Sequence, residues 1–151
     1  MSSLTAEYAL RAVVMLGSNP GRPQTTQQIA EQTQVPAGYL SKVLQALGRA
    51  GEVESQRGLK GGFVLARPLA DLTLLDVVNA VDPLERIERC PLGRIEHVTR
   101  LCPLHRHLDR GIAEMESVLK GTTIAQLFAE HDVSQPLCVV PAHHKPRRCS
   151  G

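Results

Sequence analysis

Two cysteines and a histidine could bind a metal ion or react with an oxidant. Cys102 opens the segment Cys-Pro-Leu-His, in which Pro103 is expected at the first position of a helix and Cys102 at its cap. The partial positive charge at a helix start favours the thiolate, the form of cysteine that binds metals. His105 follows by three residues, about one turn along the same face. With Cys90 on the far side of a loop, these residues predict a small ligand site.

The residue types and their spacing do not determine what this site would bind. A zinc ion held by Cys90, Cys102 and His105 is one candidate, because mixed sulfur and nitrogen ligands suit zinc. Unligated thiols are the other. Cys138, between Leu137 and Val139, is expected to be a small apolar residue and Cys149 a loose thiol of the tail, so neither is assigned to the site.

A second candidate site is the glycine-rich segment 56–62. Residues 52–55 alternate like a strand and residues 63–66 resume that character, which predicts a β-hairpin. Its tip carries Arg57 and Lys60 among three glycines, so the backbone can lie close to phosphates while Arg57 enters a narrow minor groove. An ordinary solvated hairpin is the alternative for this tip.

The segments before the hairpin predict a helix-turn-helix. Helical spacing favours a first helix over 5–17 behind a threonine cap, and a short second helix capped by Thr25 or Thr26 and ending before Pro36. A third helix is expected from Pro36 to Ala50, with Gly51 as its breaker. Its polar side would present Tyr39, Ser41 and Lys42 to a DNA groove. A hairpin after a helix-turn-helix is a wing.

The carboxyl-terminal half predicts three more helices. A short one follows Thr73 to Val81, and a loop runs from Leu84 to about Leu101. The longest helix comes next, ending at Gly121, and a last short helix is capped by Thr122 or Thr123. Apolar residues recur along the long helix at steps of three and four, namely Leu101, Leu104, Leu108, Ile112, Met115 and Leu119.

That apolar seam could pair with its symmetry mate or pack on the chain's own helices. A winged helix generally needs a partner to read two half-sites about 34 Å apart, which favours a homodimer.

Composition favours one folded unit in the cytoplasm. The chain has 151 residues, is 42% hydrophobic and has only two Tyr, two Phe and no Trp, so its core must be aliphatic. Glu7 and Arg11 interrupt the first apolar stretch, so no signal peptide is predicted, and no segment is long enough to cross a membrane. Reduced thiols or metal ligands are more plausible here than a disulfide framework.

The charge distribution is compatible with DNA binding but does not decide it, and the motifs argue against catalysis. Residues 1–67 hold seven Lys and Arg against four Asp and Glu, while the remainder of the 17 and 15 in the chain, ten and eleven, lie in 68–151. An excess of three suits a phosphate-facing surface. No catalytic triad order, paired-carboxylate motif, Walker loop or dinucleotide fingerprint occurs, so an enzyme or electron carrier is only a remote alternative.

The sequence resembles the Rrf-two family of winged-helix transcription regulators (the IscR/NsrR family), which includes repressors that sense iron-sulfur status and nitric oxide. The resemblance covers residues 2–130. It is carried by Leu4 to Leu16, Thr26-x-x-Ile29-Ala30, Gly38-Tyr39-Leu40, Leu44-x-x-Leu47, Ala50-Gly51 and Arg57-Gly58-x-x-Gly61-Gly62-Phe63-x-Leu65-Ala66-Arg67.

This resemblance implies a homodimer with a long crossing helix, a recognition helix in the major groove of operator DNA and a wing arginine in the minor groove. By position these roles fall to Tyr39, Ser41, Lys42 and Arg57, with Lys42 as a phosphate contact. Tyr39 could equally be a residue at the edge of the core.

Cluster-binding members of the family have three cysteines separated by five residues each in the loop before the long helix. Here Cys90 and Cys102 match the outer pair, while Glu96 stands at the middle position and His97 follows it. Two thiolates can still hold two irons when nitrogen or oxygen ligands complete the set. The resemblance thus favours a [2Fe-2S] cluster held by Cys90, Cys102 and His105.

The fourth ligand of that cluster would be Glu7 from across the dimer, or His97. A zinc-binding or cluster-free repressor is the alternative. The expected divisions are a DNA-binding domain over 1–82, a candidate cluster loop and helix start over 83–106, a dimerisation helix with a short terminal helix over 101–131, and a disordered tail over 132–151.

Overall fold

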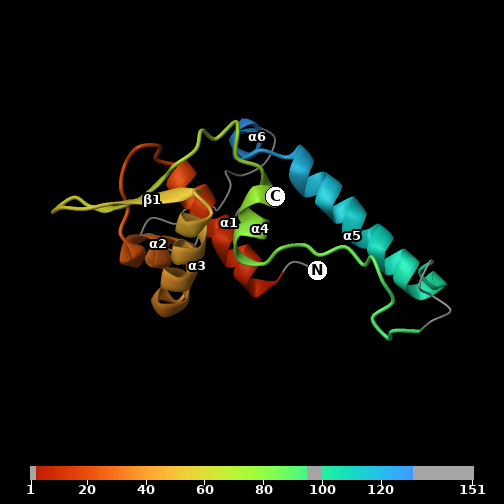
Figure 1. Ribbon diagram of the computed structural model, residues 1–151. Coiled ribbons are helices and arrows are strands. Elements are labelled where there is room, and N and C mark those ends of the chain that lie inside the picture. The colour runs from red at the N-terminus through yellow and green to blue at the C-terminus, as the bar shows by residue number, and fades with distance from the viewer. Residues whose placement is uncertain (1–2, 95–99, 131–151) are drawn as a thin grey trace, which may run out of the picture.

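A computed structural model of the protein describes residues 3–94 and 100–130. The predicted fold, mainly helical with a small β-hairpin in a winged helix-turn-helix and a long helix after it, is confirmed (Figure 1). The expected tail over 132–151, with Cys138 and Cys149, lies outside the described residues. The elements are α1 (Leu4–Gly17), α2 (Thr26–Thr33), α3 (Ala37–Arg49), β1 (Val53–Gln56), β2 (Gly62–Leu65), α4 (Leu74–Val81), α5 (Pro103–Gly121) and α6 (Ile124–Ala129).

Side-chain caps define where most of these helices begin. Thr25, Thr73 and Thr123 each accept a hydrogen bond from the third helical amide, and the residue at that third position bonds back to the cap. The sequence left the cap open between Thr25 and Thr26 and between Thr122 and Thr123. The capping boxes show that the caps are Thr25 and Thr123. The threonine cap predicted for α1 is wrong, because Ser3 accepts the bond from the Ala6 amide at 3.2 Å.

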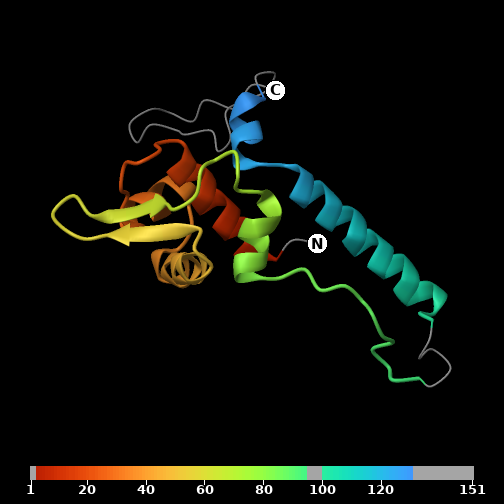
Figure 2. The same ribbon diagram turned by 45° about the horizontal axis from the view of Figure 1, so that its top comes forward.

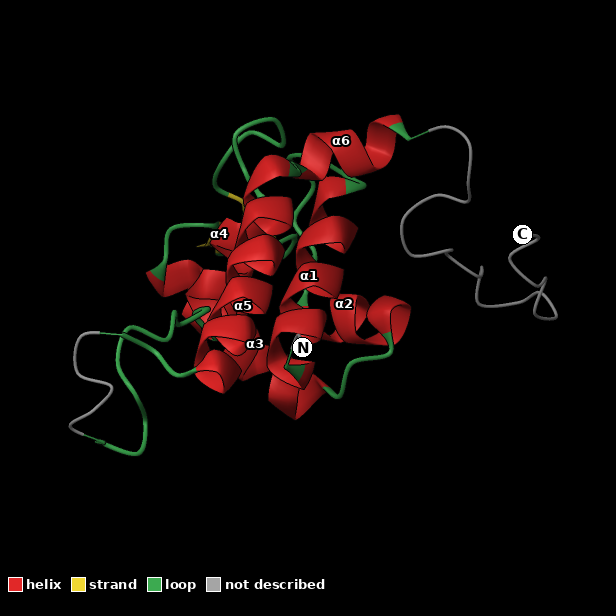
Figure 3. Ribbon diagram, turned by 90° about the vertical axis from the view of Figure 1, so that its right-hand side faces the viewer, coloured by secondary structure: helices red, strands yellow, loops and turns green. Residues whose placement is uncertain are grey.

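The core gathers around α1, which contacts α2, α3 and α4. Aliphatic side chains fill it, as the scarcity of aromatic residues requires, and α6 closes one end of it. A Cβ on Gly17 would meet Phe128 of α6 at 3.2 Å, so the glycine lets the end of α1 and α6 approach closely. Figure 3 shows α6 lying across this end of α1. The largest fully buried side chains are Met15, Leu16, Ile29, Leu40, Leu44, Leu47, Leu72 and Ile124.

The hairpin is a two-stranded antiparallel sheet in which Val53 faces Leu65 and Gln56 faces Gly62. A third segment joins its edge through Gln24. The Gln24 amide donates to the Phe63 carbonyl at 3.0 Å, and the Phe63 amide donates to the Gln24 carbonyl at 2.7 Å. This bridge ties the wing to the loop that precedes α2.

An ion-pair cluster joins the base of the wing to α4. Arg67 donates to both carboxylate oxygens of buried Glu52 at 3.2 Å, and its guanidinium lies 3.3 Å from Asp76. Burial raises the pKa of Glu52, and the charge of Arg67 offsets only part of that rise. Burial also acts to raise the pKa of Asp76, but bonds from Thr73 and the nearby Arg67 bring it below its ordinary value.

The molecule has two parts of different character (Figures 1 and 2). Helices α1 to α4 and the hairpin form the helix-turn-helix body, while α5 and the loop before it extend away on one side. Backbone bonds at the far end of α5 bring the chain back, with the Leu74 amide donating to the Thr122 carbonyl and the Ile124 amide to that of Leu72. Only one end of the long helix is therefore attached to the body by backbone pairing in the described chain.

Candidate nucleic-acid interface and sensor loop

Helix α3 has the two-sided character of a recognition helix. Leu40, Val43, Leu44 and Leu47 are buried against the body, while the opposite side is exposed. The exposed side is built from small and polar residues, as a helix entering a DNA groove requires. The Ser41 hydroxyl donates back to the Ala37 carbonyl at 3.1 Å. The residues of this surface are Ala37, Gly38, Tyr39, Ser41, Lys42 and Gln45.

Tyr39 lies at the edge between this surface and the core. Its hydroxyl and that of Thr5 are 2.6 Å apart, and its ring meets the Tyr8 ring edge to face with centroids 5.3 Å apart. The side chain is still 39% exposed. Tyr39 therefore anchors α3 to the first turns of α1, and part of its side chain remains exposed to solvent.

The wing tip extends from the same end of the body as α2 and α3 (Figures 1 and 2). Arg57, Leu59 and Lys60 are exposed there. Gly58 has a φ of 120°, in the region that favours glycine, which allows the tight turn between the strands. The structure thus places both wing cations and the α3 surface at one end of the molecule.

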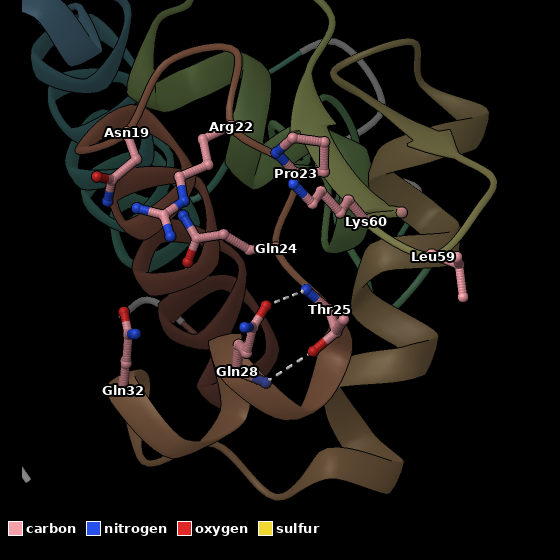
Figure 4. A pocket seen from close by; sticks show the side chains of 10 residues that line it. Asn19, Arg22, Pro23, Gln24, Thr25, Gln28, Gln32, Leu59 and Lys60 are labelled. Atoms are coloured by element: carbon pink, nitrogen blue, oxygen red, sulfur yellow. Dashed lines mark hydrogen bonds between the residues drawn. The ribbon is translucent and has the colours of Figure 1, made fainter.

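A polar cleft between the wing tip and α2 was not predicted from the sequence. Figure 4 shows its lining, with Arg22 on the loop before α2 and Lys60 on the wing. Arg22 carries no local signal of function, because its approach to the wing depends on the distant Gln24–Phe63 bridge. The volume of the cleft is about 550 Å³.

At the start of α5 the structure brings Cys102 and His105 together. Cys102 is the N-cap, Pro103 occupies the first turn, and the Cys102 sulfur lies 3.2 Å from His105 Nδ1. Both residues are half-buried. The pair offers one sulfur and one nitrogen ligand within a single turn, the arrangement that the spacing predicts.

Cys90 lies half-buried in the loop before α5, in a turn where the Gly93 amide donates to its carbonyl at 3.0 Å. The loop is fastened to α5 by Arg86, which makes two bonds of 2.7 Å to the Asp109 carboxylate. Hydrogen bonds from Arg86 and from the Ile87 amide lower the pKa of Asp109 to about 2. Glu96 and His97 fall outside the described residues.

Glu7 lies on the first turn of α1 and is half exposed. Its carboxylate pairs with Arg11 at 3.0 Å, and Arg11 also donates to the Thr33 carbonyl. Figures 1 and 2 both place the start of α1 apart from the start of α5. Among the described residues of this one chain, no three His, Cys, Asp or Glu side chains group closely enough to hold a metal ion. The chain therefore does not bring Glu7 to its own Cys102.

Helix α5 has 19 residues, and none of them is buried within the described chain. Ile112, Met115 and Leu119 are half-buried, and α5 contacts α4. Toward the other end, Leu104 and Leu108 are 63% and 51% exposed. The predicted seam is thus covered in part by the chain itself and bare near Cys102.

A family model described as "Rrf2: Iron-dependent Transcriptional regulator" matches residues 2–130. The chain belongs to the Rrf2 family. This family consists of transcriptional regulators and not of enzymes, so the enzyme alternative is set aside and the predicted resemblance is confirmed. Among the described residues, no helix is long and apolar enough to cross a bilayer.

Solved structures of similar fold include an IscR protein and two CymR proteins. The IscR of T. potens has a TM-score of 0.71 and 22% identity, covering 87% of this chain and 88% of that one, which shows the shared fold. CymR, the global cysteine regulator of B. subtilis, has a TM-score of 0.68 and 26% identity over 86% of this chain and 97% of that one. The CymR of Staphylococcus aureus is 27% identical, with a TM-score of 0.67, over 85% and 98% of the two chains.

Proposed function

We propose that this Rrf2-family protein is a cytoplasmic, homodimeric repressor that binds double-stranded operator DNA and senses redox or nitric oxide status through an iron-sulfur cluster. In this proposal Ser41, Lys42 and the accessible part of Tyr39 face the major groove. Arg57 enters the minor groove, and Lys60 contacts phosphate. Support comes from the polar outer side of α3 and from the exposed cations of the wing at the same end of the body.

The homodimer in this proposal pairs α5 with its counterpart in a second copy. Exposed Leu104 and Leu108 support it, since a long helix without a buried side chain has little packing energy in one chain. Pairing two such helices would remove their leucines from water and set two recognition helices at a fixed spacing. On this proposal residues 101–131 form the dimerisation unit and residues 1–82 the DNA-binding domain.

The sensor in this proposal is a [2Fe-2S] cluster held by Cys90, Cys102, His105 and Glu7 of the partner subunit. The observation that carries it is the 3.2 Å approach of Cys102 Sγ to His105 Nδ1 at a helix start. This donor set suits iron that is bound by two thiolates and by nitrogen and oxygen ligands. When bound, the cluster would supply an oxidant- and nitric oxide-sensitive group beside the dimer helix. Release of weak ligands would then couple to the affinity for DNA.

A second candidate is a cluster-free or zinc-binding repressor with the same DNA-binding surface. Its cluster-free form is favoured by the similarity to CymR, described as a cysteine regulator, and by the lack of a three-ligand group among the described residues. In this case Cys102 would act as a reactive thiol, or zinc would use Cys90, Cys102 and His105.

The deciding experiment is anaerobic purification followed by iron, sulfide and zinc assays and visible absorption spectra. The variants are Cys102→Ala and His105→Ala, with Cys138→Ala as a matched control that removes a thiol outside the proposed ligand set. About two irons and two sulfides per subunit, lost in both ligand variants and kept in the control, are expected for the cluster. A colourless, iron-free wild type would contradict the cluster, and about one zinc per subunit would identify the metal of the second candidate.

A further inference from the structure

The cleft beside α2 has a lining suited to an anion. Two cations border it and no acidic residue does, while four neutral amide side chains add hydrogen-bond donors. In the view of Figure 4, the Lys60 side chain extends from the wing toward Pro23, and the Arg22 side chain lies on the other side of Gln24. The lining consists of Asn19, Arg22, Pro23, Gln24, Thr25, Gln28, Gln32, Leu59, Lys60 and Gly61.

The two walls of the cleft are held at a fixed separation by the Gln24–Phe63 bridge. Gln24 is only 6% exposed, and its side-chain amide donates to the Met15 carbonyl at 3.3 Å, so the bridge is anchored to the end of α1. A Cβ on Gly62 would lie 2.5 Å from the Gln24 carbonyl oxygen, and one on Gly61 would lie 2.4 Å from that of Gln56. The glycines therefore permit a close contact that forms the cleft before any ligand arrives.

The place and size of the cleft identify the class of anion. It opens between the wing and α2. With α3 in the major groove and the wing in the minor groove, as the proposed function has it, the DNA strand between the two grooves would pass over this cleft. A volume of about 550 Å³ exceeds what a single small ion fills and is in the range of pockets for larger ligands. Arginine, lysine and amide side chains are the groups that contact phosphate and sugar in protein–DNA complexes.

We propose that this cleft receives the sugar–phosphate backbone of one DNA strand, with Arg22 and Lys60 binding phosphates from its two walls. The inference rests on the proposed DNA-binding function and adds a site that reads no base. Phosphate contacts contribute to affinity in a salt-dependent and sequence-independent way. Arg22 and Lys60 thus set how tightly, and in which register, α3 is pressed into the groove.

The test measures DNA affinity over a series of salt concentrations for wild type, Arg22→Gln, Lys60→Gln and the double variant. Two probes are used: a random-sequence duplex, and the tightest duplex that the wild type selects from a random pool. Because each substitution occurs in both copies of the proposed homodimer, each single variant is expected to reduce the slope of log K against log salt by about 1.8, and the double variant by about twice that. Binding to both probes should weaken by the same factor. Lys120→Gln, which removes an exposed cation at the carboxyl-terminal end of α5, should leave the slope unchanged.

Three outcomes separate this inference from the function on which it rests. A wild type that binds neither duplex overturns the DNA-binding function and the cleft with it. A wild type that binds, with variants that keep its full salt slope, overturns the cleft alone. Variants that weaken binding only to the selected duplex overturn it too, because they would mark base contacts. Unfolding temperatures equal to that of wild type confirm that the variants are folded.

Discussion

The helix-turn-helix body and the arm formed by α5 and its preceding loop are built on opposite principles. In the body, α1 buries eight residues and α3 buries four, so each helix is held by its neighbours in the same chain. In the arm, α5 is the longest helix of the described chain and buries none. Since helices in proteins are stabilised mainly by packing an apolar face, the body is self-sufficient and the arm is incomplete in a single chain.

The kinds of contact differ in the same way. The body has a continuous aliphatic core, whereas the loop of the arm is fastened by hydrogen bonds and ion pairs between Arg86 and Asp109. Apolar contacts in a packed core are insensitive to pH, while these polar bonds depend on a carboxylate. The body is therefore stabilised within one chain, while the arm beside Cys102 is the part that the proposed dimer would complete and the proposed sensor would regulate.

The largest effect is expected from a core truncation. Leu44→Ala removes a side chain that is 1% exposed, so the free energy of unfolding should fall by about 2–5 kcal/mol. Leu108→Ala removes a side chain that is 51% exposed, so its effect should grow with protein concentration and vanish in dilute solution. Urea unfolding at two protein concentrations measures both. Equal losses for both variants at every concentration would contradict the contrast between body and arm.

A somewhat smaller effect is expected on the dissociation constant of the proposed dimer. Leu104→Asp would place a carboxylate in the proposed apolar seam once in each copy, which should weaken the dimer about 100-fold or more, or about 2.7 kcal/mol. Ser117→Asp, on the exposed side of α5 opposite Leu104, is the matched control and should dimerise like wild type. Sedimentation over a range of concentrations gives both dissociation constants. If Leu104→Asp stays as dimeric as the control, α5 is not the interface.

The body could be predicted from sequence because its signals are local. Threonine caps, a proline before α3 and apolar residues at helical spacing each act within one element, so every helix was found with ends close to those observed. The alternation of residues 52–55 and the glycines that follow predicted the wing in the same way. Only the cap of α1 was missed, since Ser3 and Thr5 are both residues that cap helices.

What the sequence could not predict depends on contacts between distant residues. Arg22 and Lys60 line one cleft only because Gln24 pairs with Phe63. Likewise, the apolar spacing along α5 predicts a helix but does not show what covers its apolar side. That Met115 is half-buried while Leu104 is exposed is known only from the structure. Tyr39 has a polar and an apolar part, and its bond to Thr5 decides how much of it faces outward.

The smallest predicted effect concerns the bond between Arg86 and Asp109, which fastens the loop of the arm to α5. Asp109 should titrate at about 2 in the folded protein, below its ordinary 3.8, because Arg86 and the Ile87 amide donate to it. A carboxyl whose pKa is lowered by folding stabilises the folded arm fully above about 3.8, and that contribution is lost as the pH falls toward 2.

In Arg86→Gln the pKa of Asp109 should therefore rise most of the way to 3.8, with the Ile87 bond keeping it slightly below. Arg110→Gln is the matched control, because Arg110 pairs with Glu114 and should leave the Asp109 titration unchanged. An NMR titration of the Asp109 carboxyl carbon distinguishes the three proteins. A wild-type pKa near 3.8 would mean that the loop is not fastened to α5 in solution. The loop that carries Cys90 would then lie beside α5 only when a ligand or a partner subunit holds it there.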